Sequence, residues 1–344
     1  MRAIAYTRTG APDVLQPVDR DEAAPGPGPG EVRVRVVVSG VNPTDWKSRD
    51  GGAPGQELPF PEVVPNQDGA GVIDAVGPGV TDLAVGDRVW IMLAAHGRPT
   101  GTAQEKTVLP VDRVAPLPDG LSFDLGASLG VPAVTAHRAL TVSEDGPSRL
   151  APGALAGTHV LVAGGAGAVG HAAIQLARWA GATVITTVSS PEKAALATAA
   201  GAHHVVDYKA GDAAAEIQSI APDGVDLIVE VAPAQNAALN QAVAKNRASV
   251  AVYANNGGDT VTLPVVDSFV KNLRYQFLLL YTVGQEALDA ARADIHLALI
   301  DGVLPVGEDA GLPITRFPLE RTADAHQAVE DGVTGKVLID VTPA

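Results

Sequence analysis

The stretch His159-Val-Leu-Val-Ala-Gly-Gly-Ala-Gly-Ala-Val-Gly170 decides the fold of this 344-residue chain. It begins with an apolar run suited to a buried strand, and its last six residues fit the pattern G-x-G-x-x-G. Apolar residues then follow at helical spacing, at Val169, Ala173 and Leu176. The glycines let the backbone approach a phosphate closely, and the helix N-terminus offers N–H groups with partial positive charge. The stretch therefore predicts a strand, turn and helix that bind the pyrophosphate of a dinucleotide; a turn without a ligand is the alternative.

Strand and helix patterns alternate in the same way over the middle of the chain. Alanine-rich segments of helical length separate short runs rich in β-branched residues. The runs are His159–Ala163, Ala182–Thr187, His204–Val206, Val225–Val229 and Ser249–Tyr253. Strands that alternate with helices pack as a parallel sheet covered on its faces. We therefore expect an α/β fold with a Rossmann doubly wound parallel sheet over residues 131–281.

The first third of the chain has short apolar runs between dense turns. Residues Glu31–Val38 alternate apolar and charged side chains, and Val72–Val76 and Arg88–Met92 are further short runs bounded by Gly, Pro and Asp. This pattern predicts a barrel-like, β-rich domain.

The last part of the chain does not continue the alternation of the middle segment. It contains one helical stretch, Gln285–Asp301, and one final strand, Lys336–Val341. We therefore expect residues 1–130 and 282–344 to form the β-rich domain, with residues 131–281 as the dinucleotide-binding domain inserted between them.

Composition narrows the partners of the protein. The net charge is −15 with no local cluster of lysine and arginine, which argues against binding to nucleic acid. The chain has no cysteine, which excludes disulfides, thiolate nucleophiles and cysteine-rich zinc sites. Its apolar runs are interrupted well short of the ~20 residues that a membrane span needs, and the N-terminus lacks an apolar signal core. We expect a cytoplasmic protein that has no membrane partner.

A second part of the nucleotide site follows the strand Ala182–Thr187. In NAD-specific domains an acidic residue about 20 positions beyond the glycine motif binds the ribose 2′-hydroxyl. Here Ser189, Ser190 and Lys193 stand at that place, with Glu192 as the one carboxylate. Two hydroxyls and an ammonium group suit a 2′-phosphate, so the segment favours NADPH. The alternative for Lys193 is a solvated residue of the first helical turn.

Six motifs follow one another along nearly the whole chain: Gly40–Trp46 (GVNPTDW), Asp68–Gly77 (DGAGVIDAVG), Val85–Val89 (VGDRV), Val131–Leu140 (VPAVTAHRAL), Ala163–Gly170 and Thr334–Val337 (TGKV). In this order they resemble the medium-chain dehydrogenase/reductase superfamily and, within it, the zeta-crystallin-like quinone oxidoreductases. The resemblance implies a GroES-like substrate domain formed by both chain ends around a Rossmann domain. It also implies a homodimer in which edge strands of the Rossmann domain pair.

The resemblance also implies positions for the site residues. The candidate catalytic residues are Asn42, Lys47 and Tyr253, and Thr135 would face the nicotinamide carboxamide. The other predicted cofactor contacts are Gly165, Ala166, Gly167, Ala168, Val169 and Gly170 at the pyrophosphate, Thr186, Ser189, Ser190, Lys193 and Tyr208 toward the adenosine phosphate, and Val252, Ala254, Asn255, Leu278, Leu279 and Leu280 at the nicotinamide.

The departures from the zinc-containing relatives predict a site without metal. Those relatives carry a cysteine at or next to the position of Asn42, and a His-Glu pair where Gln67 and Asp68 stand here. Without a thiolate or an imidazole at these positions, a Lewis-acid site is not expected. A further departure is Tyr253-Ala254 in place of the family's Val-Gly, which would narrow the nicotinamide pocket.

We expect a reductase that transfers hydride from NADPH to a small-molecule quinone, with proximity in a dry site as the main source of rate. The alternative is reduction of an α,β-unsaturated carbonyl compound, which needs a proton donor such as Lys47, Tyr253 or Tyr281. A non-catalytic NADPH-binding protein is the third reading. The loop Asp50–Pro59 is either a lid over the site or a passive surface loop.

Overall fold

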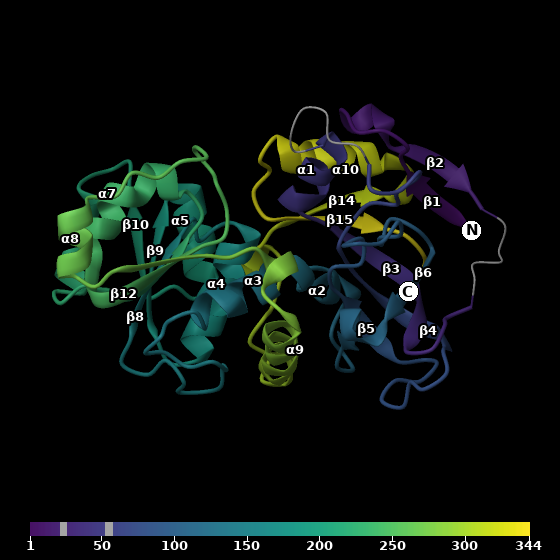
Figure 1. Ribbon diagram of the computed structural model, residues 1–344, viewed down its shortest axis with the longest axis horizontal. Coiled ribbons are helices and arrows are strands. Elements are labelled where there is room, and N and C mark those ends of the chain that lie inside the picture. Colours follow the sequence, from purple (N-terminus) through teal and green to yellow (C-terminus); the bar gives the residue numbers. More distant parts are fainter. Residues whose placement is uncertain (21–25, 52–57) are drawn as a thin grey trace. The chain divides into compact units, whose positions relative to one another are not determined.

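The computed structural model describes residues 1–20, 26–51 and 58–344, so most of the predicted lid loop lies outside the described residues. The chain divides into two compact units (Figure 1). Unit 1 comprises Met1–Val131 and Pro313–Ala344, and unit 2 comprises Pro132–Leu312. Within the described ranges, no helix has both the length and the apolar character needed to cross a lipid bilayer.

Unit 1 is built on a sheet in the order β14-β15-β3-β4-β5-β7, with β6 also paired to β3. Every pairing except that of β14 with β15 is antiparallel. The long strand β3 alternates Val32, Val34 and Val36 with arginines, and these three valines are fully buried in the core. The strands are β1 (Arg2–Ala5), β2 (Gln16–Asp19), β3 (Glu31–Val41), β4 (Asp68–Val76), β5 (Arg88–Ile91), β6 (Lys106–Pro110), β7 (Val114–Pro116), β14 (Ile314–Pro318) and β15 (Lys336–Asp340).

Short helices complete unit 1 and connect it to unit 2. They are η1 (Pro12–Val14), α1 (Pro43–Asp50), η2 (Val111–Arg113), α2 (Phe123–Ala127), η5 (Leu319–Arg321) and α10 (Thr322–Glu330), while α3 (Gly130–Leu140) runs from unit 1 into unit 2. The C-terminal strand β15 lies against β3 from the first part of the chain (Figure 1). Both chain ends therefore form one β-rich unit.

Unit 2 contains a six-stranded sheet in the order β10-β9-β8-β11-β12-β13, and every pairing in it is parallel. Its strands are β8 (His159–Ala163), β9 (Thr183–Val188), β10 (His204–Asp207), β11 (Val225–Glu230), β12 (Ala244–Val252) and β13 (Arg274–Phe277). Its helices are α4 (Ala168–Trp179), α5 (Pro191–Ala199), α6 (Ala213–Ile220), α7 (Pro233–Val243), α8 (Val265–Val270), η3 (Leu280–Thr282), α9 (Gln285–Ile300) and η4 (Glu308–Ala310). The α/β fold class predicted from the sequence is confirmed.

The strand order reverses between β8 and β11, since the chain runs outward from β8 to β10 and then returns to β11. Ligands of open parallel sheets bind outside the carboxyl ends of the strands at such a reversal. The glycine motif follows the carboxyl end of β8 and therefore lies at this point.

The position of α9 corrects the predicted domain division. Residues 282–312 were expected in the β-rich domain, whereas the structure places them in unit 2. Asp294 of α9 is buried and accepts hydrogen bonds from His137 Nε2 at 2.8 Å, Arg149 Nε at 2.8 Å and the Leu150 backbone N–H at 2.7 Å. These partners all precede β8. The helix therefore packs with the segment that enters unit 2, although it does not continue the strand and helix alternation.

Candidate functional site

The glycine loop after β8 leaves room for a ligand at one of its glycines. A Cβ atom at Gly165 would lie 2.2 Å from Thr186 Oγ1, and one at Gly170 would lie 2.4 Å from the Gly164 carbonyl oxygen. A Cβ at Gly167 would meet only that carbonyl oxygen, at 3.5 Å. Gly165 and Gly170 are thus required by packing within the protein, whereas Gly167 is exposed and has space above it.

Helix α4 starts at Ala168, directly after this space, with Gly167 as its N-cap residue. The first N–H groups of a helix have no acceptor within the helix, and they favour an anion. Ala168 and Val169 are half-buried, so the loop offers the geometry that a pyrophosphate requires. Thr186 lies below the loop: its fully buried hydroxyl donates to the Val162 carbonyl oxygen at 2.7 Å.

The residues predicted to hold the 2′-phosphate lie together at the ends of β9 and β10. Lys193 Nζ donates to Ser189 Oγ at 3.3 Å, and Ser190 Oγ caps α5 by accepting from the Lys193 N–H at 3.4 Å. Tyr208 is 50% exposed, and its backbone N–H donates to the Val188 carbonyl oxygen at 3.1 Å. Glu192 is exposed, and a hydrogen bond from Ser190 lowers the pKa of its carboxyl group. The hydroxyls of Ser189 and Ser190 and the ammonium group of Lys193 thus lie in neighbouring positions at the end of β9.

A pocket of about 420 Å³ lies at the carboxyl ends of β12 and β13. It brings together six residues that were predicted to lie at the nicotinamide: Val252, Tyr253, Ala254, Asn255, Leu278 and Leu279. Leu280 is buried at the start of η3, and the predicted contact Thr135 is buried on α3. Seven further residues line this pocket and were not predicted from the sequence: Pro233, Gly258, Asp259, Thr260, Val261, Phe277 and Thr282. Strand β13 is the signal that could have found some of them, since Phe277 is its last residue. This strand was not among the runs identified from the sequence.

Tyr253 gives this pocket a polar group. Burial and the carboxylate of Glu230, which is itself buried, both raise the pKa of the Tyr253 hydroxyl. The backbone N–H of Tyr253 donates to the Glu230 carbonyl oxygen at 3.1 Å. The hydroxyl therefore stays protonated at neutral pH, and it can act as a neutral hydrogen-bond donor.

Asn42 and Lys47 belong to unit 1. Asn42 is the buried N-cap of α1, and its side chain bonds to Asp68 and Lys336. Lys47 is half-buried on the same helix, with its ammonium 5.9 Å from the centroid of the Trp46 ring. Lys336 belongs to the TGKV motif but was not among the site residues predicted from the sequence.

Asp45 is a second buried carboxylate next to Asn42. It accepts hydrogen bonds from the backbone N–H groups of Asn42 at 2.7 Å and Gln67 at 3.0 Å. Burial, reinforced by the nearby charge of Asp68, raises the pKa of Asp45 to about 7. Burial also raises the pKa of Asp68, which Lys336 and Asn42 partly offset. This part of unit 1 is therefore a closed polar cluster around one ammonium group.

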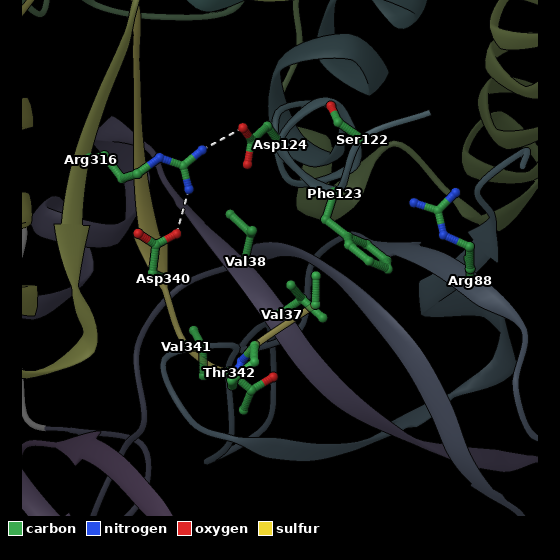
Figure 2. Close-up of a pocket in the computed structure, with 12 residues that line it drawn as sticks. Val37, Val38, Arg88, Ser122, Phe123, Asp124, Arg316, Asp340, Val341 and Thr342 are labelled. Carbon is green, nitrogen blue, oxygen red and sulfur yellow. Dashed lines mark hydrogen bonds and ion pairs between the residues drawn. The ribbon is translucent and has the colours of Figure 1, made fainter. Parts of the chain in front are cut away.

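A second cavity, of about 680 Å³, lies in unit 1 between α2, β14 and the C-terminal residues (Figure 2). Its floor is apolar, with Val37, Val38 and Phe123. Figure 2 shows Arg316 turned toward both Asp124 and Asp340, with which it forms ion pairs. Arg88 also lines this cavity, where its guanidinium donates to the carbonyl oxygens of Pro118 and Leu121. We assign the cavity no ligand.

Comparisons with known proteins agree with this geometry. Residues 28–119 match the family model of the alcohol dehydrogenase GroES-like domain, and residues 168–294 match that of the zinc-binding dehydrogenases. The chain is 32% identical to the quinone oxidoreductase of Rattus norvegicus, over 98% of this chain and 97% of the rat protein.

Solved structures with similar folds include a mycobacterial protein in complex with NADPH, with a TM-score of 0.80 and 29% identity over 98% of this chain and 99% of the other. A 2-haloacrylate reductase has a TM-score of 0.79 and 28% identity, with 100% of both chains covered.

Proposed function

Because this chain belongs to the quinone oxidoreductase family of medium-chain dehydrogenases/reductases, we propose that it catalyses NADPH-dependent reduction of a quinone. The main observation in support is the open space beside Gly167 at the start of α4. A Cβ atom placed there would contact only the Gly164 carbonyl oxygen, at 3.5 Å. The similarity to the rat quinone oxidoreductase supports a quinone as the acceptor, and the similarity to the mycobacterial NADPH complex supports NADPH as the cofactor.

The residues present fit NADPH. The N–H groups at the start of α4 would hold the pyrophosphate, and Ser189, Ser190, Lys193 and Tyr208 would surround the 2′-phosphate. When bound, NADPH supplies the hydride. The protein's contribution is to bind cofactor and acceptor face to face and to exclude water between them.

The pocket at Tyr253 suits a flat acceptor of limited size. Val252, Leu278 and Leu279 give it apolar walls, and the Tyr253 hydroxyl can donate to a carbonyl oxygen. A quinone that takes up a hydride needs one further proton to become a quinol, and water can supply that proton at oxygen. The reaction therefore requires no dedicated acid from the protein.

Reduction of an α,β-unsaturated carbonyl compound is the second candidate, favoured by the likeness to the 2-haloacrylate reductase. In this reaction hydride adds to the β-carbon and a proton must then reach carbon or oxygen. Because the pKa of the Tyr253 hydroxyl is raised, this hydroxyl holds its proton tightly. It is therefore suited to donate a hydrogen bond to an enolate oxygen, and it is less suited to transfer the proton. The same pocket can thus serve either acceptor.

The side chains that stand where zinc relatives hold their metal do not fit zinc. Asn42 and Gln67 are amides, and Asp68 is bound to an ammonium group, so neither thiolate nor imidazole is offered. The proposed reaction therefore uses no metal ion at these residues. Elemental analysis of the purified protein and assays with a chelator test this point directly.

Turnover is tested by the loss of NADPH absorbance with an ortho-quinone or an unhindered alkyl enone, with NADH in parallel. We expect NADPH to be preferred, and we expect Lys193→Ala to raise the KM for NADPH by about tenfold, which corresponds to about 1.4 kcal/mol. The KM for NADH is the internal control and should not change. Equal use of both cofactors by the wild-type protein, or alcohol-dependent NAD reduction abolished by the chelator, would contradict the proposal.

We also propose that two copies pair through β13. This strand ends the six-stranded sheet within the described residues, and the adjacent helix α8 exposes Val265, Val266, Phe269 and Val270 at 62% to 72%. An open strand edge beside an apolar patch is a surface for association of copies.

The cytoplasmic location expected from the sequence stays a prediction.

Phe269→Asp should convert the dimer into a monomer, because the new carboxylate would be buried without a partner. Light scattering after size exclusion gives the mass of each variant. Val85→Asp is the matched control, since Val85 is 65% exposed in unit 1 and should not alter the mass. A wild-type protein that is monomeric at micromolar concentration would rule out this interface.

A further inference from the structure

The pocket at Tyr253 lies on the same edge of the sheet as the glycine loop. Every pairing in this sheet is parallel, so the carboxyl ends of β8, β12 and β13 face one way. The order β8-β11-β12 separates the loop from the pocket by two strand spacings, which is about 10 Å. Ligands of parallel sheets bind along this edge. The pocket is therefore placed to hold a ligand near a dinucleotide bound at the loop, and all of its lining residues belong to unit 2.

The charge of the lining is the feature that distinguishes this pocket. Among the described residues that line it, Asp259 is the only charged one, and none is a lysine, an arginine or a histidine. Asp259 is exposed, and its carboxylate accepts a hydrogen bond from Asn255 Nδ2 at 2.6 Å. The other lining side chains are apolar, hydroxyl or amide groups. The described lining therefore offers no cation to an anionic ligand.

A second carboxylate lies next to the pocket, at the end of β11. Glu230 is the last residue of this strand and is fully buried. Its Oε1 accepts from the Ala232 N–H at 2.6 Å and from Asn236 Nδ2 at 3.0 Å, and its Oε2 accepts from Asn240 Nδ2 at 2.6 Å. Both oxygens accept, as in an ionised carboxyl group. All three donors are neutral, so these hydrogen bonds stabilise the negative charge without cancelling it.

Helix α7 begins directly after Glu230, and the start of a helix would otherwise attract an anion. Here the N–H of the N-cap residue Ala232 already donates to the Glu230 carboxylate. Pro233, the first helical residue, has no N–H. The N–H groups of Gln235 and Asn236 donate to the Ala232 carbonyl oxygen at 3.0 Å each. The anion position at this helix start is therefore occupied by the protein's own carboxylate, in contrast to the open start of α4.

The distribution of charge over the sheet strengthens this contrast. Burial and then the charge of Glu230 raise the pKa of the Tyr253 hydroxyl, so the negative charge is felt at the pocket. The basic residues of β12 and β13 stand at or near the amino ends of these strands, where Lys245, Arg247 and Arg274 each form an ion pair. An anion in the pocket would thus meet carboxylates on its own side of the sheet, while these cations lie toward the other edge.

We propose that this pocket selects an uncharged acceptor, with Glu230 and Asp259 as the residues that exclude acceptors bearing a carboxylate, a sulfonate or a phosphate. The inference rests on the proposed function, in which the pocket holds the acceptor. An anionic acceptor would lose hydration of its charge without gaining a partner, and both carboxylates would repel it. A neutral acceptor avoids this cost, and the Tyr253 hydroxyl can donate to its carbonyl oxygen. The substrate class is therefore neutral quinones and neutral enones, and not unsaturated acids.

The test uses two naphthoquinones with the same short saturated side chain, which ends in a methyl ester in one and in a free carboxylate in the other. The saturated chain keeps the reactivity of the quinone ring nearly equal in the two compounds. We expect kcat/KM with NADPH at neutral pH to be about tenfold higher for the ester, because two nearby carboxylates repel the acid. Added salt should reduce this ratio, since the exposed Asp259 is screened.

The variant Asp259→Asn removes one charge from the lining with little change in shape. It should reduce the ratio of ester to acid by about threefold, the size expected for one water-exposed charge at close range. Asp223→Asn is the matched control: Asp223 is also exposed in unit 2, but it precedes the amino end of β11 and should leave the ratio unchanged. Glu230→Gln should reduce the ratio as well. It places an amide N–H among N–H donors and is expected to lower stability, which thermal unfolding measures.

Binding gives a readout that does not depend on turnover. Calorimetric titration of both compounds in the presence of NADP⁺, which cannot reduce them, should show tighter binding of the ester and a smaller difference in Asp259→Asn. This result would support the inference even if the NADPH assay shows no turnover, which would count against the proposed function alone. Equal binding and turnover of ester and acid by the wild-type protein, binding of neither compound, or a preference that persists unchanged in Asp259→Asn and Glu230→Gln would each overturn the inference.

Discussion

Gly167→Val is expected to lower the affinity for NADPH by about a hundredfold, equivalent to about 2.8 kcal/mol, while the protein stays folded. The Gly167 backbone is extended, with φ −86° and ψ 161°, which valine adopts readily. Within the protein a Cβ there meets nothing closer than 3.5 Å, so the new side chain would fill only the space in which the pyrophosphate is proposed to lie. Fluorescence titration with NADPH gives the affinity, and thermal unfolding gives the stability.

Two further glycines make the experiment specific. Gly170→Ala should show the opposite pattern, with a clear loss of stability, because its Cβ would lie 2.4 Å from a backbone oxygen. Gly211→Ala, where a Cβ meets nothing within 4 Å, should affect neither property. Unchanged NADPH affinity in folded Gly167→Val would mean that the cofactor does not bind over this loop.

Asp294→Ala is expected to lower the free energy of unfolding by about 3–5 kcal/mol, the usual effect of breaking a buried ion pair. The substitution would leave His137 Nε2, the Arg149 guanidinium and the Leu150 N–H without their shared acceptor. Urea unfolding gives the value. Asp289→Ala on the same helix is the control: Asp289 is exposed and bonds only to surface side chains, so it should change stability by less than about 1 kcal/mol.

The stabilisation from Asp294 also has a defined pH dependence. Burial alone would raise its pKa, but hydrogen bonds from His137, Arg149 and the Leu150 N–H outweigh it and lower the pKa from 3.8 to about 2. A carboxyl group with a lowered folded-state pKa stabilises the fold above its unfolded pKa and loses this effect as the pH falls. The stability difference between wild type and Asp294→Ala should therefore be complete above about pH 4 and shrink toward pH 2. A difference that is constant over this range would refute the explanation.

Local patterns in the sequence were sufficient to predict the strand, loop and helix at the start of the sheet in unit 2. Strand β8, the glycine loop and α4 are consecutive in the chain, and their hydrophobic spacing and glycines act over a few residues at a time. The same holds for Ser189, Ser190 and Lys193, which are neighbours at the end of one strand. In such segments the backbone geometry follows from the residues themselves, so the prediction needed no knowledge of distant contacts.

Contacts between distant residues could not be predicted in this way. The assignment of α9 to unit 2 depends on Asp294, whose partners His137 and Leu150 are more than a hundred positions away in the chain. The parallel pairing of β12 with β13 assembles the pocket at Tyr253, and the six of its residues that were predicted came from the family resemblance and not from local patterns.

By itself the sequence determined the α/β class, the position of the glycine loop between a strand and a helix, and the absence of thiolates, and it predicted the phosphate-binding role of that loop and the preference for a 2′-phosphate. Only the tertiary structure decided where α9 packs and that Lys336 lies against Asn42, 294 positions away. The physical reason is that propensity and periodicity act between neighbours in the chain, whereas a buried ammonium is placed by sheet register and by the glycines that make room for it.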